Sequence, residues 1–167
     1  MTAKAPLFRD RLDTPLGPLT LVWGEKGLRA AEFGKSAGTR LKGLLRSGAE
    51  NPYRKAFLAY FAGNLDAFAS LTFDPEGTGF QKRVWQRLLA IPPGETRNYS
   101  DIARGLGMPF AARAVGAANG QNPIAIAVPC HRVIGKDGTL TGYAGGLKRK
   151  AWLLCHEKAL TPARPGY

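Results

Sequence analysis

Residues 99–118 read YSDIARGLGMPFAARAVGAA, and this stretch decides the fold of the second half of the chain. Its first eight residues predict a short helix, the Gly-Met-Pro run at 107–109 interrupts that helix, and a second helix resumes at 110–118. Small Ala103 faces the turn. Apolar residues on the expected inner side are Ile102, Leu106 and Val115. Such a pattern is typical of a helix-turn-helix, with which many proteins bind DNA.

The second helix of this pair consists almost entirely of Ala and Gly around a single Arg113. It lacks the long side chains that read base edges in the major groove. A helix with so little side-chain bulk can approach a ligand closely, as a minor-groove or shape-based binder requires.

Downstream of these helices, residues 129–133 read PCHRV and set Cys130 beside His131. A thiol reacts as its thiolate, and a neighbouring imidazole is the usual group that lowers its pKa or takes its proton. The apolar, partly β-branched run at 122–128 predicts that Cys130 lies where a buried, strand-like segment meets a turn, with its thiol exposed and unpaired. Taken alone, Cys130 could also be a buried structural thiol.

The chain carries 24 Lys and Arg against 12 Asp and Glu, a net charge of +12. This excess favours a polyanionic partner, nucleic acid above all, because binding to it releases counterions. With 167 residues, 44% of them hydrophobic, the chain can bury a real core and does not have a disordered composition.

Two cysteines, Cys130 and Cys155, make no disulfide framework, and the two histidines, His131 and His156, add no zinc-finger spacing. We therefore expect no metal and no cofactor. The N-terminus has no apolar signal core, and no stretch approaches the ~20 apolar residues that span a membrane. These features predict a soluble protein of a reducing, cytoplasmic compartment that does not contact membranes.

In the first half of the chain, residues 19–23 predict a strand, and GEKG at 24–27 closes a hairpin onto residues 28–33. Apolar residues recur at helical spacing over 53–61, before a stop at Gly63. Strands and a helix together predict a small α/β lobe.

Turn-forming residues at 73–77 separate this lobe from a new helical pattern, which residues 91–94 end. The predicted domains are therefore an N-terminal α/β lobe, 1–76, and a mainly helical C-terminal lobe, 77–167. The predicted inner face of the first C-terminal helix consists of Phe80, Val84, Trp85, Leu88 and Leu89.

A co-linear set of short motifs resembles the O6-alkylguanine-DNA alkyltransferases, the methylated-DNA–protein-cysteine methyltransferases, of the bacterial stand-alone type. The motifs are GFQ at 79–81 with VW at 84–85, IP at 91–92 with Gly94, Thr96 and Tyr99, ARAVG at 112–116, NP at 122–123, PCHRV at 129–133, and GY at 142–143 with GG at 145–146. TPLGPL at 14–19 resembles the opening of those proteins. The resemblance implies an α/β protein with a ribonuclease-H-like N-terminal lobe and a winged-helix-like C-terminal lobe.

The resemblance also implies direct-reversal DNA repair, in which Cys130 irreversibly takes the alkyl group from O6-alkylguanine or O4-alkylthymine. A thioether is not hydrolysed, so the protein would be consumed in a single-turnover suicide reaction. By the same resemblance, His131 activates Cys130 through a water, Glu157 orients His131, and Asn122 braces the turn. Tyr99 would donate a hydrogen bond as charge develops on the leaving base.

The target base lies inside duplex DNA, so the resemblance implies base flipping, with Arg113 filling the vacated space from the minor groove. The other residues implied to contact DNA are Ala112, Gly116 and Asn119. Those implied to bind the flipped base are Tyr99, Val133, Tyr143, Ala144 and Gly145, with the backbone of Cys130. Ala144 stands where many relatives have Ser, which leaves the range of alkyl groups open. A monomer is expected, with cooperative binding along DNA left open.

Each role has a simpler alternative. Glu157 could be a surface residue at the end of a helix, and Arg113 a solvated one. His131 could be a hydrogen-bonding structural residue, and Tyr99 could only cap the core. We interpret Cys155 and Trp85 as packing residues.

Other classes of function compete with repair. A lesion-sensing relative without a nucleophile usually has Trp where this chain has Cys130. A transcription regulator of this kind carries a further zinc domain, for which the chain has neither the length nor the cysteines. A thiol hydrolase would also use Cys and His, but it would turn over.

Overall fold

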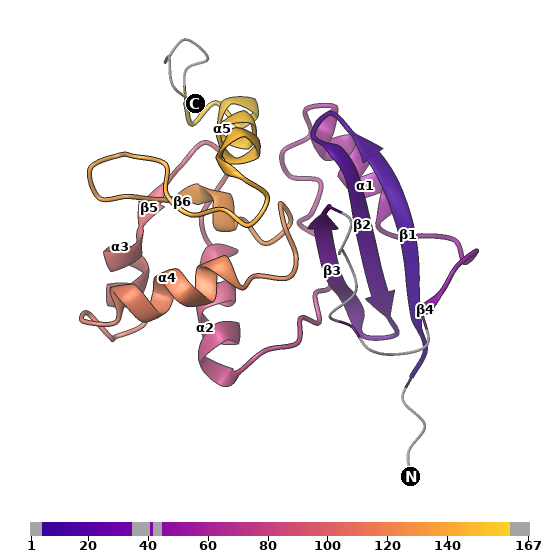
Figure 1. Ribbon diagram of the computed structural model, residues 1–167, viewed down its shortest axis with the longest axis horizontal. Helices are drawn as coiled ribbons and strands as arrows, with labels where there is room; N and C mark the ends of the chain where they lie inside the picture. The colour runs from indigo at the N-terminus through magenta and orange to yellow at the C-terminus, as the bar shows by residue number, and fades with distance from the viewer. Residues whose placement is uncertain (1–4, 35–40, 42–44, 161–167) are drawn as a thin grey trace. The chain divides into compact units, whose positions relative to one another are not determined.

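The computed structural model describes residues 5–34, 41 and 45–160. The chain folds into two compact units, Met1–Glu76 and Gly77–Tyr167. Figure 1 shows strands with one helix in the N-terminal unit and mostly helices in the C-terminal unit. No helix in the described ranges is both long enough and apolar enough to cross a membrane.

The N-terminal unit is built on a four-stranded sheet of order β3-β2-β1-β4. β1 (Leu7–Thr14), β2 (Gly17–Gly24) and β3 (Gly27–Phe33) pair antiparallel, and the short β4 (Leu45–Arg46) pairs parallel to β1. Gly27 ends the second turn at φ +143, where an added Cβ would lie 2.6 Å from the carbonyl oxygen of Thr72. The hairpin predicted around residues 24–27 is confirmed.

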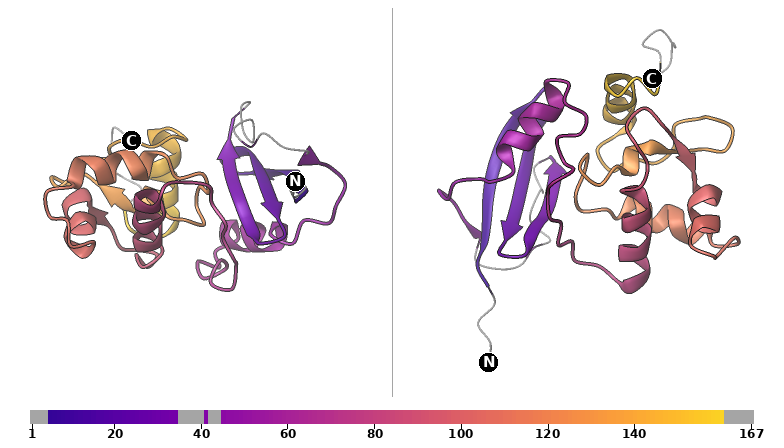
Figure 2. Two further views of the ribbon diagram at one scale, coloured as in Figure 1. Left: turned by 90° about the horizontal axis from the view of Figure 1, so that it is seen from below. Right: turned by 180° about the vertical axis from the view of Figure 1, so that it is seen from behind.

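One helix, α1 (Arg54–Phe61), lies across one face of this sheet (Figure 2). Its buried side chains, Phe57 and Tyr60, pack on Phe68, with ring centroids 4.8 and 5.2 Å apart. The helix predicted over 53–61 is confirmed, starting one residue later. Burial of these aromatic rings stabilises a helix that is too short to persist alone in water.

The C-terminal unit starts with α2 (Gly79–Leu88), which begins at a capping box between Thr78 and Gln81. Val84, Trp85 and Leu88 are buried as predicted. The prediction for Leu89 is wrong: it is 38% exposed, because the helix ends at Leu88 and Leu89 is its C-cap.

The helix-turn-helix is confirmed as α3 (Tyr99–Gly105) and α4 (Ala112–Gly120). Gly107 lies in the turn at φ +71, a left-handed conformation that favours glycine. The second helix starts two residues later than predicted, because the amide of Ala111 donates to the carbonyl of Met108 in a turn. Trp85 Nε1 donates to the carbonyl of Ala118 at 2.8 Å and so fixes α4 against α2.

The remaining elements of this unit include the short helix that contains the Cys-His pair. They are β5 (Arg97–Asn98), η1 (Cys130–Arg132), β6 (Val133–Ile134), which pairs parallel to β5, and α5 (Leu147–His156). The apolar run before Cys130 is not the predicted strand. Residues 125–127 form a turn, in which Ile126 has φ +73 and the amide of Ala127 donates to the carbonyl of Ala125.

Candidate active site

Asn122 holds the turns that lead to Cys130. Its Nδ2 donates to the carbonyls of Val128 at 2.8 Å and Ile124 at 3.2 Å, and its Oδ1 accepts from the amide of Ile124 at 3.0 Å. One amide side chain thus pairs backbone groups that a strand would otherwise pair with a neighbour. The sequence prediction assigned this bracing position to Asn122.

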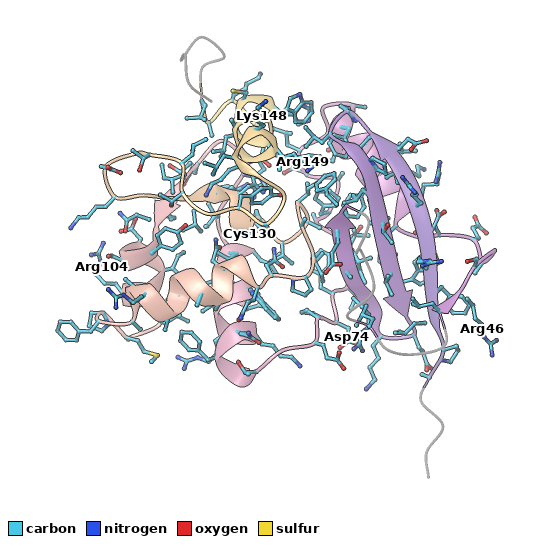
Figure 3. The ribbon with its side chains drawn as sticks, in the orientation of Figure 1. Arg46, Asp74, Arg104, Cys130, Lys148 and Arg149 are labelled. Atoms are coloured by element: carbon cyan, nitrogen blue, oxygen red, sulfur yellow. The ribbon has the colours of Figure 1, made fainter. Side chains whose placement is uncertain are left out.

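Cys130 begins η1 and is 7% exposed, so the expectation of an exposed thiol is wrong. Figure 3 marks its place inside the C-terminal unit. Burial raises the pKa of the Cys130 thiol, although a hydrogen bond from Asn122 and the charge of Lys150 act in the opposite direction. The resting side chain is therefore a neutral thiol that needs a base before it can attack.

His131 Nε2 lies 2.8 Å from Glu157 Oε1, and both side chains are buried. Burial lowers the pKa of His131 despite the hydrogen bond and the charge of Glu157. A neutral ring that donates Nε2–H to the carboxylate keeps a lone pair on Nδ1. Nδ1 is buried and has no protein partner among the described residues. His131, the residue that follows Cys130 in the chain, can therefore act as a base through Nδ1.

Glu157 is not the surface residue of the alternative interpretation: it is buried and bonded at both oxygens. Arg132 Nε donates to Oε2 at 2.9 Å, and Arg132 Nη2 donates to Oε1 at 2.8 Å. Burial would raise the pKa of Glu157, but the hydrogen bonds from Arg132 and His131 outweigh it and hold that pKa well below its usual range. Sequence reasoning missed Arg132, which no spacing rule links to Glu157.

Lys150 is the second residue that sequence reasoning missed. Its buried Nζ donates to the carbonyls of Val133 and Thr141, each at 2.6 Å. Burial lowers the pKa of Lys150 to about 8, although the charge of Cys130 acts in the opposite direction. A signal was present, because Lys150, Leu153, Leu154 and Glu157 follow the i, i+3, i+4, i+7 spacing of one buried helix face.

The residues expected to bind a base come from three segments, one of which is β6, where Val133 is fully buried. Tyr99 at the start of α3 places its hydroxyl 3.1 Å from Thr141 Oγ1. Tyr143 has a buried hydroxyl with no protein partner among the described residues, and burial raises its pKa well above the usual value. A Cβ on Gly145 would lie 2.8 Å from the Tyr143 ring, so that ring requires glycine there. Ala144 is exposed.

The expected DNA contacts divide into two groups. Arg113 is exposed on α4, and Ala112 and Gly116 are half-buried on the same helix. Asn119 does not share that surface. It is 3% exposed, and its Nδ2 donates to the carbonyl of Cys130 at 3.4 Å, so it braces the cysteine instead.

Other residues singled out from the sequence lie outside this arrangement. Cys155 is half-buried on α5, and Trp85 packs in the core. The His156 ring stacks on Trp152 with a centroid separation of 4.8 Å. In the part of the chain that the structure describes, no three His, Cys, Asp or Glu residues group as metal ligands would.

The C-terminal unit thus combines a helix-turn-helix, a fold typical of DNA-binding proteins, with a buried cysteine next to a hydrogen-bonded histidine–glutamate pair. The sequence of the chain matches the 6-O-methylguanine DNA methyltransferase family in both units: the ribonuclease-like domain over residues 7–75 and the DNA binding domain over residues 79–159. The chain belongs to this family, and the fold class expected from the resemblance is confirmed.

Relatives cover nearly the whole chain. The methylated-DNA–protein-cysteine methyltransferase of Salmonella typhimurium is 50% identical over 163 residues, which cover 90% of this chain and 95% of the relative. The protein of the same name from Mycobacterium tuberculosis is 49% identical over 154 residues, 91% of this chain and 93% of the relative. The expected activity, alkyl transfer from DNA to protein in direct-reversal repair, is confirmed at this level.

Solved structures agree in fold. The crystal structure of Mycobacterium tuberculosis OGT in complex with DNA superposes with a TM-score of 0.78 at 48% identity, covering 95% of this chain and 96% of that chain. The O6-methylguanine-DNA methyltransferase of Pyrococcus kodakaraensis has a TM-score of 0.69 at 26% identity, covering 90% and 98%.

Proposed function

We propose that Cys130 is the residue that takes the alkyl group, from O6-alkylguanine or O4-alkylthymine in duplex DNA, once per molecule. One observation carries this proposal. Cys130 is buried and is followed in the chain by His131, whose Nε2 lies 2.8 Å from Glu157 Oε1. Sulfur forms a bond to the sp3 carbon, the carbon–oxygen bond breaks, and its electrons stay on the base. The thioether that forms has no hydrolytic route back to a thiol.

His131 acts as the base in this proposal. Cys130 is a neutral thiol at rest, and the lone pair on His131 Nδ1 can take its proton through a water. Glu157 then stabilises the imidazolium, and Arg132 keeps Glu157 ionised throughout. The Lys150 charge favours the thiolate from a buried position.

The leaving base needs a proton or a hydrogen-bond donor as negative charge develops on it. The Tyr99 hydroxyl, at the start of α3, is proposed to donate to the flipped base. Tyr143 and Gly145 would line the base site, with backbone groups of Val133 and Ala144 reading the base edges. The carbonyl of Val133 already accepts from Lys150, which orients it.

We expect α4 to contact DNA in the minor groove. The exposed Arg113 is proposed to hold the flipped state by filling the space that the base leaves, while Ala112 and Gly116 allow close approach. We place this reaction in the cytoplasm, where Cys130 stays reduced, and assign it to a monomer with 1–76 and 77–167 as its two domains.

Intact-mass measurement after incubation with methylated duplex DNA tests the proposal. We expect the mass to rise by one methyl group, located on Cys130, and then to stop. Cys130→Ser should bind DNA and transfer nothing. Continued release of methylated product would indicate a thiol hydrolase, and binding without any mass change would indicate a lesion sensor.

A further inference from the structure

The turn between α3 and α4 exposes apolar side chains that the reaction above does not use. Phe110 is 100% exposed and Met108 is 39% exposed, with the exposed Pro109 between them. In the described part of the chain the other exposed large apolar residues, Leu58, Leu89 and Leu147, lie between 38% and 46%. Because Met108, Pro109 and Phe110 are exposed, apolar and consecutive and form a patch, they point to a partner that covers them.

The backbone holds this turn in a defined conformation. The amide of Met108 donates to the carbonyl of Ala103 at 3.0 Å, and the amide of Ala111 donates to the carbonyl of Met108 at 2.9 Å. The backbone at Phe110 is therefore held by the hydrogen bonds of the turn, two residues before α4 begins at Ala112. Figures 1 and 2 show this turn at an edge of the C-terminal unit.

Cationic side chains lie at the end of α3, where the chain enters the apolar turn. Arg83 and Arg87, on α2, donate to the carbonyls of Leu106 and Gly105 at the end of α3. Arg104, labelled in Figure 3, has a side chain 60% exposed, and its salt-bridge partner is Asp101.

An exposed apolar ring four to five residues after these arginine-bound carbonyls matches a partner that combines apolar surface with negative charge. The minor groove of DNA has this combination, with sugars and base edges between two rows of phosphates. A second copy of the chain fits less well, because each copy carries a net charge of +12.

We propose that Phe110 is an apolar wedge that enters the minor groove beside the bound nucleotide and packs against sugars and base edges, supported by Met108 and Pro109. This inference rests on the proposed binding of DNA along α4. Phe, Met and Pro are among the apolar side chains with which other minor-groove proteins wedge into the groove, between base steps. The wedge would contribute to DNA affinity through apolar contact, which does not depend on neutralising phosphates.

The salt dependence of duplex binding tests the wedge. Phe110→Ala should weaken binding roughly 5- to 100-fold, the range typical of lost aromatic contacts with nucleic acid, and leave the slope of log Kd against log salt unchanged. Arg104→Ala should instead change that slope by about 0.9 if the side chain neutralises one phosphate. Leu58→Ala, which removes a 45% exposed apolar residue of α1, is the matched control.

Two further measurements separate the outcomes. Phe110→Trp should keep wild-type affinity, and Phe110→Ala should react normally with free O6-alkylguanine base, which needs no groove contact. Unchanged duplex affinity in Phe110→Ala would overturn the wedge, as would a wild-type dimer in sedimentation that Phe110→Ala converts to monomer. A wild-type protein that neither binds duplex DNA nor accepts a methyl group would instead overturn the proposed function.

Discussion

His131 Nε2 and Glu157 Oε1 are 2.8 Å apart, and Glu157 is at the same time held by Arg132 through both of its oxygens. A carboxylate shared in this way cannot easily take a proton. It can fix the histidine tautomer and stabilise positive charge on the ring, so the proton from Cys130 is expected to stay on His131 until the base leaves.

Glu157→Gln should lower both repair and stability. The amide cannot balance the Arg132 charge, and breaking a buried pair costs about 3–5 kcal/mol of unfolding free energy. An amide N–H facing Nε2 would also favour the tautomer with its proton on Nδ1, which removes the base. Urea unfolding and single-turnover rates measure the two effects. Glu95→Gln, in an exposed pair with Arg97, is the control and should change neither.

His131→Ala should slow single-turnover repair by roughly 10²- to 10⁴-fold, the effect typical of a positioned acid-base group. DNA affinity should change little, because His131 is buried below the surface. The same substitution at the other histidine, His156→Ala, removes a ring that is stacked on Trp152 and should leave the rate near wild type. Equal rates in all three proteins would exclude His131 from the mechanism.

Lys150 predicts a pH-dependent stability. Its pKa is lowered to about 8 in the folded state, whereas the unfolded value is 10.5. Between these values Lys150 binds more protons in the unfolded chain, so its contribution to the unfolding free energy rises with pH across this window, by at most about 3 kcal/mol. Denaturant unfolding of wild type and Lys150→Met from pH 7 to 10.5 measures it, and the rise should be missing from the variant. Parallel curves would mean that Lys150 titrates normally in the folded protein.

Gly116→Ala should raise thermal stability while weakening DNA binding. An added Cβ would lie 3.7 Å from the Tyr99 ring, an ordinary contact, and alanine in a helix is better than glycine by roughly 0.5–1 kcal/mol. The same methyl group would stand on the face of α4 proposed to approach DNA. Melting curves and duplex titrations test both directions. Gly79→Ala in α2, where a Cβ meets nothing within 4 Å, should leave DNA affinity unchanged.

Arg113→Ala should slow repair in duplex DNA far more than attack on free O6-alkylguanine base, since only the duplex requires flipping. Rates on the two substrates, measured in single-turnover conditions, give the comparison. Arg46→Ala in the N-terminal unit removes an exposed positive charge from β4 and serves as control. Equal losses on both substrates would assign Arg113 a role other than holding the extrahelical base.

Local patterns in the sequence were sufficient for the hairpin, for α1 and for the helix-turn-helix, because apolar spacing, caps and turn residues act over a few residues. They failed for residues 124–128, whose apolar character resembles a strand. There the Asn122 amide pairs backbone groups and Ile126 takes a positive φ, neither of which periodicity records. The prediction that Leu89 is buried also failed, because the helix ends at Leu88 and apolar spacing does not record where a helix ends.

The Cys130–His131 pair was visible as adjacent letters, and family motifs pointed to Glu157. Only the tertiary structure joined Arg132 to Glu157 and buried Lys150 against the carbonyl of Val133. The tertiary structure also buries Asn119 and leaves Phe110 exposed. Burial and pKa depend on what other segments bring within a few ångströms, and these contacts join residues 11 to 25 positions apart in the chain. The chemistry of the cysteine is therefore a property of the packed unit rather than of the motif.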